Sequence, residues 1–420
     1  MAAVLGAPRY ARLVTHDSSP DLHVVSHGAD DKCSVRKRRG HYSTFAFVGV
    51  VVFAAAVLWA GLLTLRFEVE EWRFDFLRWE ITSIPNKWLY ALGRPLRDDL
   101  SPNEAILRYF SLDDRSGVLA ARLEPVVEAA IEGRIDAVLK ELGVVGRVPL
   151  PGSVFPPVDV QLALPPRVLV TSPREQIKRL SDQLLRPGLS LDEVVELERA
   201  VEEHDSQLSA LVLRTAGVAL YPAVVSTGRT YTGTLSIVAH EWVHHYLSFY
   251  PLGVSYFRSQ ELRTLNETVA DVVGDEVAAR VLERFGDPTE GAPSSLTGAV
   301  VLSGSGGPDS RDEHVAEVLR ALRLEVNDLL AARRLEEAER RMEQVREELA
   351  SEGIWIRRIN QAYFAWLDNY AARADSVDPL GGELRELRER LGSLEAFLNE
   401  VRDVTSRAQV QELGGRVGER

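Results

Sequence analysis

Apolar positions dominate an early stretch of the chain, residues 42–65, in which no charged residue occurs. At about 1.5 Å per residue, a helix over this stretch would be about 36 Å long, more than the hydrocarbon core of a bilayer, about 30 Å. A buried core helix of this length usually carries a polar stripe, and a cleaved signal peptide has a shorter apolar region nearer Met1. The pattern therefore predicts one transmembrane helix over residues 43–65.

The charges that flank this stretch predict its orientation. More basic residues lie just before it (Lys32, Arg36, Lys37, Arg38 and Arg39) than just after it (Arg66, Arg73 and Arg78). Basic residues favour the cytoplasmic side of a membrane, so residues 1–42 are expected to form a flexible cytoplasmic tail and the C-terminal part to lie outside the cytoplasm. Residues 66–100 form an aromatic-rich juxtamembrane segment, which packs either in the headgroup region or against the folded domain.

From residue 101 onward the apolar spacing predicts helices first and strands next. Helical spacing over residues 101–143, broken at 113–116, predicts two helices. Two short runs of strand-forming residues within 149–173 predict two strands.

The chain next offers a helical pattern followed by two apolar runs. Residues 187–211 are rich in Glu and Leu at helical spacing and predict a helix. The apolar runs at 211–214 and 218–221 are separated by Gly217, which indicates a hairpin or a bulge.

Helical spacing returns in the C-terminal half. Residues 262–281 predict a long helix, and the Gly-, Ser- and Pro-rich residues 286–310 predict a surface loop. Residues 311–352 combine helical spacing with dense charge of both signs, so they predict a charged helical hairpin that turns at 331–334. Together these patterns predict an α+β fold, mostly α, in one domain over residues 101–420.

Composition narrows the chemistry that this domain can perform. The formal net charge is −13, which argues against nucleic acid as a partner because phosphate binding needs an excess of Lys and Arg. The single cysteine, Cys33, lies in the tail, so no disulfide framework or thiolate metal site can be built. A metal ion must therefore be bound by His and carboxylate ligands.

Such ligands occur in the motif His240-Glu241-Trp242-Val243-His244, where Glu241 is the only charged residue of an apolar segment. Helix residues four apart share a face, so both imidazoles can reach one ion while Glu241 lies beside it. A buried carboxylate must be paired, neutralised or functional. The motif predicts a zinc site with Glu241 as the catalytic base, and the alternatives are a decayed site or a coincidental buried helix.

A catalytic zinc site usually has three protein ligands and an open position for water. Glu267 and Asp271 are four residues apart in the predicted helix at 262–281, so they share a face. Glu267 is the expected third ligand. Asp271 is expected to accept the second ring proton of a liganding histidine, His240, and Gly274 to let the two helices approach closely.

His-Glu-x-x-His at 240–244, followed by Asn-Glu-x-x-x-Asp at 266–271, resembles the gluzincins, the thermolysin-like zinc metallopeptidases. The resemblance covers residues 211–284, and the interval between the two motifs is somewhat longer than in thermolysin. It implies a zincin-like catalytic domain with a small β-sheet, an active-site helix and a helical lobe. It also implies peptide-bond hydrolysis by water that Glu241 deprotonates at bound Zn²⁺.

The oxyanion of such a reaction needs a hydrogen-bond donor besides zinc. Only His314 follows His245 among the histidines, and it lies in the charged hairpin, so a tyrosine is expected instead. Three tyrosines follow the motif closely, namely Tyr246, Tyr250 and Tyr256. Tyr363 lies in a segment weakly similar to predicted bacterial aminopeptidase-like gluzincins, and this similarity favours Tyr363 over the alternative of an ordinary packed aromatic residue.

The prediction is therefore a single-pass membrane zinc peptidase with an extracytoplasmic catalytic domain, whose partners are the lipid bilayer and peptide or protein substrates. Two other functions remain open. One is a catalytically inactive, membrane-anchored binding or scaffold protein of zincin fold. The other is a zinc hydrolase of non-peptide amides or esters.

Overall fold

The computed structural model describes residues 72–74, 100–145, 152–291 and 310–418. The predicted tail and transmembrane helix, most of the predicted juxtamembrane segment and much of the predicted loop at 286–310 lie outside these residues. None of the described helices is both long and apolar enough to cross a bilayer.

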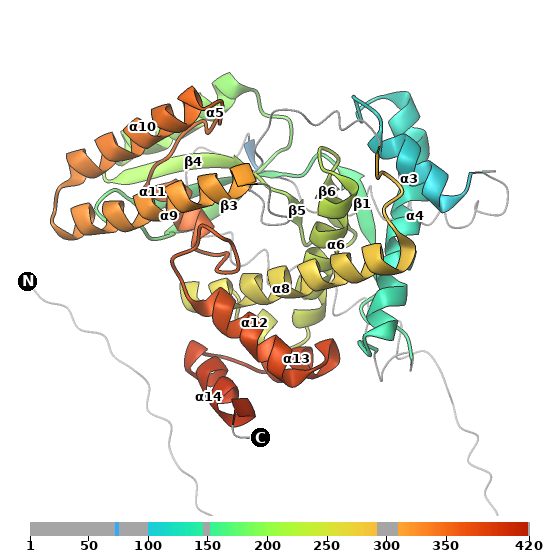
Figure 1. The fold of residues 1–420 in the computed structure, drawn as a ribbon. Coiled ribbons are helices and arrows are strands. Elements are labelled where there is room, and N and C mark those ends of the chain that lie inside the picture. The colour runs from blue at the N-terminus through green and yellow to red at the C-terminus, as the bar shows by residue number, and fades with distance from the viewer. Residues whose placement is uncertain (1–71, 75–99, 146–151, 292–309, 419–420) are drawn as a thin grey trace, which may run out of the picture. The chain divides into compact units, whose positions relative to one another are not determined.

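Helices predominate in the described residues, and two small sheets lie among them (Figure 1). The helices are α3 (Pro102–Phe110), α4 (Val118–Glu141), α5 (Leu191–His204), α6 (Tyr231–Leu247), α7 (Pro251–Val254), α8 (Gln260–Phe285), α9 (Ser310–Ala331), α10 (Leu335–Ser351), α11 (Gln361–Leu367), α12 (Leu380–Leu391), α13 (Leu394–Val401) and α14 (Arg407–Gly418). The strands are β1 (Val160–Ala163), β2 (Arg167–Pro173), β3 (Ser181–Leu185), β4 (Leu208–Arg214), β5 (Gly217–Val218) and β6 (Ala223–Ser226). This confirms the predicted α+β class with mostly α structure.

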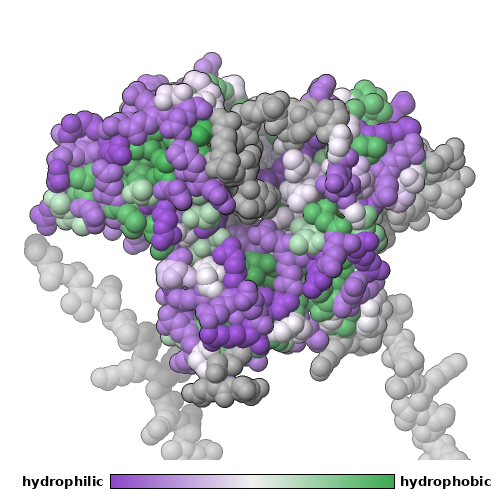
Figure 2. Space-filling model, viewed as in Figure 1, coloured by the Kyte–Doolittle hydropathy of each residue, from purple (hydrophilic) through white to green (hydrophobic). Residues whose placement is uncertain are grey.

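One sheet has the strand order β3-β2-β4, with antiparallel pairs throughout, and helices cover both of its faces. Alternate residues of a strand point to opposite faces. Val168 and Val170 pack in a cluster with α9, α10 and α11, whereas Leu169 packs in a second cluster with α5. The charged hairpin forms as predicted, because the apolar stripes of α9 and α10 face this sheet while hydrophilic side chains cover much of the surface seen in Figure 2.

The strand pairing corrects the expected hairpin around Gly217. All seven residues of β4 pair with β2, whereas Gly217 and Val218 pair with β6 in a different sheet, of order β1-β6-β5. The physical reason is burial: Leu211 and Val212 of β4 are needed in the two clusters on opposite faces of the first sheet. Helix α5 also ends earlier than predicted, at His204, and β3 matches no predicted strand.

Helix α6 lies in the largest hydrophobic cluster, which includes side chains of α3, α4, α8 and α12–α14. Its N-terminus is capped by Thr230, whose hydroxyl accepts a hydrogen bond from Gly233 N–H, and Trp242 donates to the Pro156 carbonyl at 2.8 Å. A helix that is apolar on nearly every side is stable only when buried. The sequence around the histidine motif therefore places it in the core.

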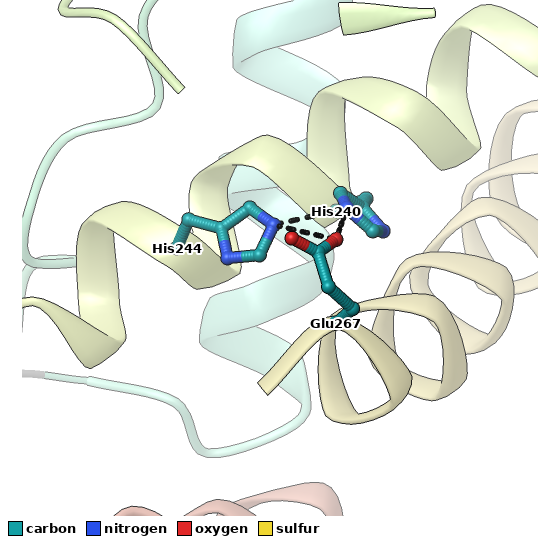
Figure 3. Close-up of side chains that lie close together, drawn as sticks. All are labelled: His240, His244 and Glu267. Carbon is teal, nitrogen blue, oxygen red and sulfur yellow. Dashed lines mark hydrogen bonds and ion pairs between the residues drawn. The ribbon is translucent and has the colours of Figure 1, made fainter. Parts of the chain in front are cut away.

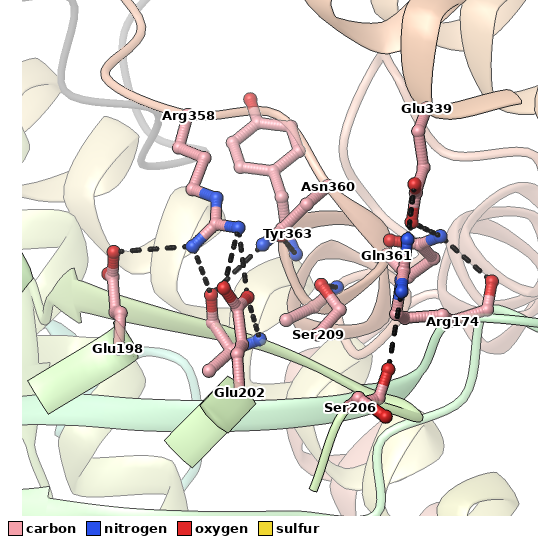
Figure 4. Close-up of polar contacts among 12 residues, drawn as sticks. Arg174, Glu198, Glu202, Ser206, Ser209, Glu339, Arg358, Asn360, Gln361 and Tyr363 are labelled. Carbon is pink, nitrogen blue, oxygen red and sulfur yellow. Dashed lines mark hydrogen bonds and ion pairs between the residues drawn. The ribbon is translucent and has the colours of Figure 1, made fainter. Parts of the chain in front are cut away.

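Ion pairs and hydrogen bonds join the helical hairpin and the segment after it to the first sheet and to α5 (Figure 4). Arg174 forms a bidentate pair with Glu339, at 2.8 and 2.6 Å, and its carbonyl accepts a hydrogen bond from Gln361. Asn360 caps α11 and donates to the Ala210 carbonyl at 2.9 Å. A cavity of about 420 Å³ lies among these groups, and its charged walls are paired with one another.

Candidate metal centre

Three side chains from two helices converge on one point (Figure 3). His240 and His244 come from α6, and Glu267 comes from α8. The two Nε2 atoms lie 3.0 Å apart, and Glu267 Oε2 lies 3.4 Å from each of them. Gly274 makes this approach possible, because a Cβ there would lie 2.8 Å from the Ser236 carbonyl oxygen and 3.2 Å from His240 N.

These separations match what a tetrahedral ion requires. With zinc–ligand bonds of about 2.05 Å, the ligand atoms of a tetrahedral site are about 3.3 Å apart. The buried group His240, His244 and Glu267 could therefore bind a metal ion. The residues fit a divalent cation of borderline softness, since two imidazoles and one carboxylate leave a fourth position open.

Each histidine has a polar partner at its other ring nitrogen. Asp271 Oδ1 lies 2.9 Å from His240 Nδ1, as the sequence predicts, and Asn266 Oδ1 lies 2.8 Å from His244 Nδ1. Both contacts favour the tautomer that leaves Nε2 free to bind a metal. Asn266 was not among the residues expected at this site. Its signal in the sequence is that it directly precedes Glu267.

The charges of this cluster are arranged to hold a cation. Burial opposes protonation of His240, but hydrogen bonds to Asp271 and Glu267 outweigh it and raise the pKa of this imidazole. Burial likewise opposes ionisation of Glu267, yet His244 and His240 hold the pKa of this carboxyl well below its usual range. A bound metal ion would take the place of the protons on the two imidazoles.

Glu241 lies beside the three ligands with its carboxylate against β5. A Cβ added at Gly217 would lie 2.4 Å from Glu241 Oε1, so only a glycine at this position leaves room for the carboxylate. Burial raises the pKa of Glu241, and the charges of His240 and His244 partly oppose the increase. A desolvated carboxylate of raised pKa is suited to accept and return a proton near neutral pH.

Two tyrosines, Tyr256 and Tyr370, lie next to the ligands. The Tyr256 hydroxyl donates to Glu267 Oε1, and its ring centroid is 6.2 Å from that of His244. The ring centroid of Tyr370 is 6.5 Å from that of His240. Tyr370 follows α11, and no spacing rule links it to the motif.

The structure does not bring Tyr363 together with the ligands. Its ring is buried in the cluster of β2 and α9–α11 and packs edge-on against Phe364. Tyr246 and Tyr250 are also engaged elsewhere, because both hydroxyls accept hydrogen bonds from Arg402. Tyr363 is therefore not next to the ligands, contrary to its expected role as the oxyanion donor. Which part of the molecule a side chain of α11 faces depends on tertiary packing, and the sequence spacing does not show this.

His245 points away from the ligands, as predicted from its position one residue after His244. Its Nε2 donates to the Leu220 carbonyl at 2.7 Å, and its ring packs edge-on against Tyr221. Burial lowers the pKa of His245 to about 4, so this imidazole is neutral.

Comparisons with known proteins give no relative from which a function could be transferred. The sequence matches no protein-family model, no curated protein and no solved structure.

Proposed function

We propose that this protein is a zinc-dependent peptidase anchored in the cell membrane. The observation that carries the proposal is the convergence of His240, His244 and Glu267 on one point, with the buried carboxylate of Glu241 beside them. A buried carboxylate is costly unless it is paired or functional. Its retention here favours an active enzyme over an inactive scaffold of zincin fold.

Zinc is the proposed ion because it usually binds four ligands, among them imidazole nitrogens and carboxylate oxygens. In catalytic zinc sites the protein supplies three of these four ligands. Bound zinc supplies Lewis acidity, which polarises a carbonyl and makes water acidic enough to be deprotonated near pH 7. Asp271 and Asn266 keep the two imidazoles in the required tautomer.

Glu241 acts as the base in this proposal. Its carboxylate accepts a proton from the attacking water and then transfers that proton to the nitrogen of the leaving amine. Gly217 leaves room for this carboxylate against β5, because it has no side chain.

Tyr370 is the proposed donor to the oxyanion. The Tyr256 hydroxyl is already engaged with Glu267, whereas the Tyr370 hydroxyl has no hydrogen bond within the described residues. Burial raises the pKa of Tyr370 well above its usual value, so the phenol keeps its proton and can donate it to developing negative charge.

The short strand β5 lies at the edge of its sheet, with β6 on its other side. An extended peptide can pair with such an edge, which would place its backbone beside Glu241. This supports a peptide as substrate. The predicted membrane helix at 43–65 and the basic residues before it favour a catalytic domain outside the cytoplasm.

The metal content and activity of Glu241→Gln test the proposal. We expect the purified full-length protein to bind about one zinc ion and to cleave peptides from a mixed library, with cleavage abolished by chelator. Glu241→Gln should keep the zinc and lose at least about a hundredfold in rate, because only proton transfer is removed. Glu283→Gln, a change at an exposed carboxylate on α8, is the matched control. Unchanged activity in Glu241→Gln, or cleavage that resists chelation, would contradict the proposal.

A further inference from the structure

Two arginines share one carboxylate close to the candidate metal centre. Arg179 precedes β3 and binds Asp182 through Nε at 3.1 Å and Nη2 at 2.7 Å. Arg263 of α8 lies 3.7 Å from the same carboxylate through Nη1. Arg179 and Arg263, which we call the arginine pair, thus carry one more positive charge than Asp182 neutralises.

The arginine pair adjoins the residues that line the metal centre. Arg263 lies four residues before Glu267 on α8, so the two side chains share a helix face. The Arg263 guanidinium carbon lies 5.4 Å from the ring centroid of Tyr256, whose hydroxyl donates to Glu267. Burial raises the pKa of both Tyr256 and Tyr370, and the charge of Arg179 partly opposes this increase. The Arg179 guanidinium therefore lies near both hydroxyls.

The guanidinium of Arg263 is incompletely paired. Its Nε is buried and has no hydrogen-bond partner in the described part of the chain. A buried donor without a partner is costly, and a carboxylate that bonds two guanidinium nitrogens is its best complement. The side chains of Arg179 and Arg263 are 4% and 14% exposed and that of Asp182 is 29% exposed, so a ligand would reach this group of three side chains from the side of Asp182.

We propose that the arginine pair binds a carboxylate of the peptide substrate. This inference rests on the proposed peptidase function and names the substrate class of the same site. One helical turn separates Arg263 from the metal ligand Glu267, which corresponds to about 6 Å between side chains. An extended peptide advances about 3.3 Å per residue, so the carboxylate lies within about two residues of the cleaved bond. It is either the C-terminal carboxylate or that of an Asp or Glu side chain.

Binding to the zinc-loaded full-length Glu241→Gln protein tests this without turnover. The probes are fluorescein-labelled hexapeptide pools, measured by fluorescence polarisation. One arm compares Glu with Gln at a fixed position, and a second arm compares a free C-terminal carboxylate with a C-terminal amide. We expect the pool with the relevant carboxylate to bind about tenfold more tightly than its neutral counterpart.

Substitutions of Arg263 and of Asp182 should change the preference for the carboxylate pool in opposite directions. Arg263→Gln in the same background should abolish it, and Arg280→Gln, also on α8 and exposed, should not. Asp182→Asn should strengthen it, because the competing carboxylate is removed. Arg263→Lys should keep part of it, and serves if Arg263→Gln does not fold.

The outcomes separate this inference from the function on which it depends. Equal binding of neutral and carboxylate pools, or a preference unchanged in a folded, zinc-loaded Arg263→Gln protein, would overturn the carboxylate inference alone. The arginine pair would then only balance the charges of Glu267, Glu241 and Asp271. If no pool binds the zinc-loaded protein, the peptidase proposal fails and this inference fails with it.

Discussion

The position of Glu241 depends on a residue that has no side chain. Gly217 is in β5, and the carboxylate of Glu241 lies in the space that any other residue would fill. A general base must lie within hydrogen-bond reach of the proton that it abstracts, and a displacement of about 1 Å can reduce the rate a hundredfold. In the proposed mechanism, Gly217 therefore affects catalysis although it takes no part in the chemistry.

Gly217→Ala should reduce the rate of peptide cleavage by about a hundredfold and leave the zinc content unchanged. The added Cβ would lie 2.4 Å from Glu241 Oε1 and 2.8 Å from Ile237 Cγ2, so these two side chains of α6 must move, while none of the three ligand side chains is among its nearest contacts. Gly228→Ala is the control, because its Cβ would meet only Ser226 Oγ, at 3.7 Å. Full activity in Gly217→Ala would show that the carboxylate works from another position.

His245 gives the stability of the protein a pH dependence that can be assigned to one residue. Its folded pKa of about 4 lies below the unfolded value of 6.5. The unfolded chain binds the proton first, so the stabilisation is complete above pH 6.5 and is lost as the pH falls toward 4. The loss amounts to at most about 3 kcal/mol of unfolding free energy.

The measurement compares chemical unfolding of the wild type and His245→Gln between pH 7 and pH 4, with chelator present in both. Other titrating groups contribute equally to the two proteins, so their difference isolates His245. We expect the advantage of the wild type to shrink across this range. A difference that does not change with pH would show that the imidazole is already charged in the folded state.

At the scale of elements, the metal centre depends on how closely α6 and α8 pack. The point of closest approach is Gly274, where a Cβ would contact backbone atoms of Ser236 and His240. Gly274→Ala should push the helices apart, lower zinc affinity and reduce the unfolding free energy by about 1–3 kcal/mol. Zinc titration and denaturant unfolding measure the two effects.

The control for Gly274→Ala is Gly133→Ala in α4. Beyond the neighbouring backbone of α4, no atom of the described residues lies within 4 Å of a Cβ at Gly133, so this change should be neutral or stabilising by up to about 1 kcal/mol. If the two substitutions had the same effect, helix propensity rather than close packing would govern Gly274.

The helices were predictable because their pattern is local. The apolar spacing of α4, α8 and α10, and the i, i+4 pairs of the metal centre, can be read within a few turns of one helix. The partner of β4 could not be predicted, since β2 lies far away in the sequence and Leu211 and Val212 favour a strand in either sheet. The positions of Tyr370 and the arginine pair could not be predicted either, because they follow from the packing of segments that are far apart in the sequence.

At the scale of the whole molecule, the candidate metal centre lies within a large hydrophobic core. Residues of α6 and α8 belong to one hydrophobic cluster, to which α3, α4 and α12–α14 also contribute. Small zinc domains unfold without their metal because they lack such a core. This protein should instead keep its fold when zinc is removed, and lose only the stability that binding adds.

Chelation should therefore lower the melting temperature and leave the helical circular dichroism signal of the folded state unchanged. At a free zinc concentration a thousandfold above the dissociation constant, binding adds about 4 kcal/mol to the unfolding free energy. The double variant His240→Ala with His244→Ala should melt at the same temperature with and without zinc, since it lacks two of the three ligands. Loss of helical signal on chelation at room temperature would show that α6 and α8 need the ion to pack, and would make the metal a structural element of this fold.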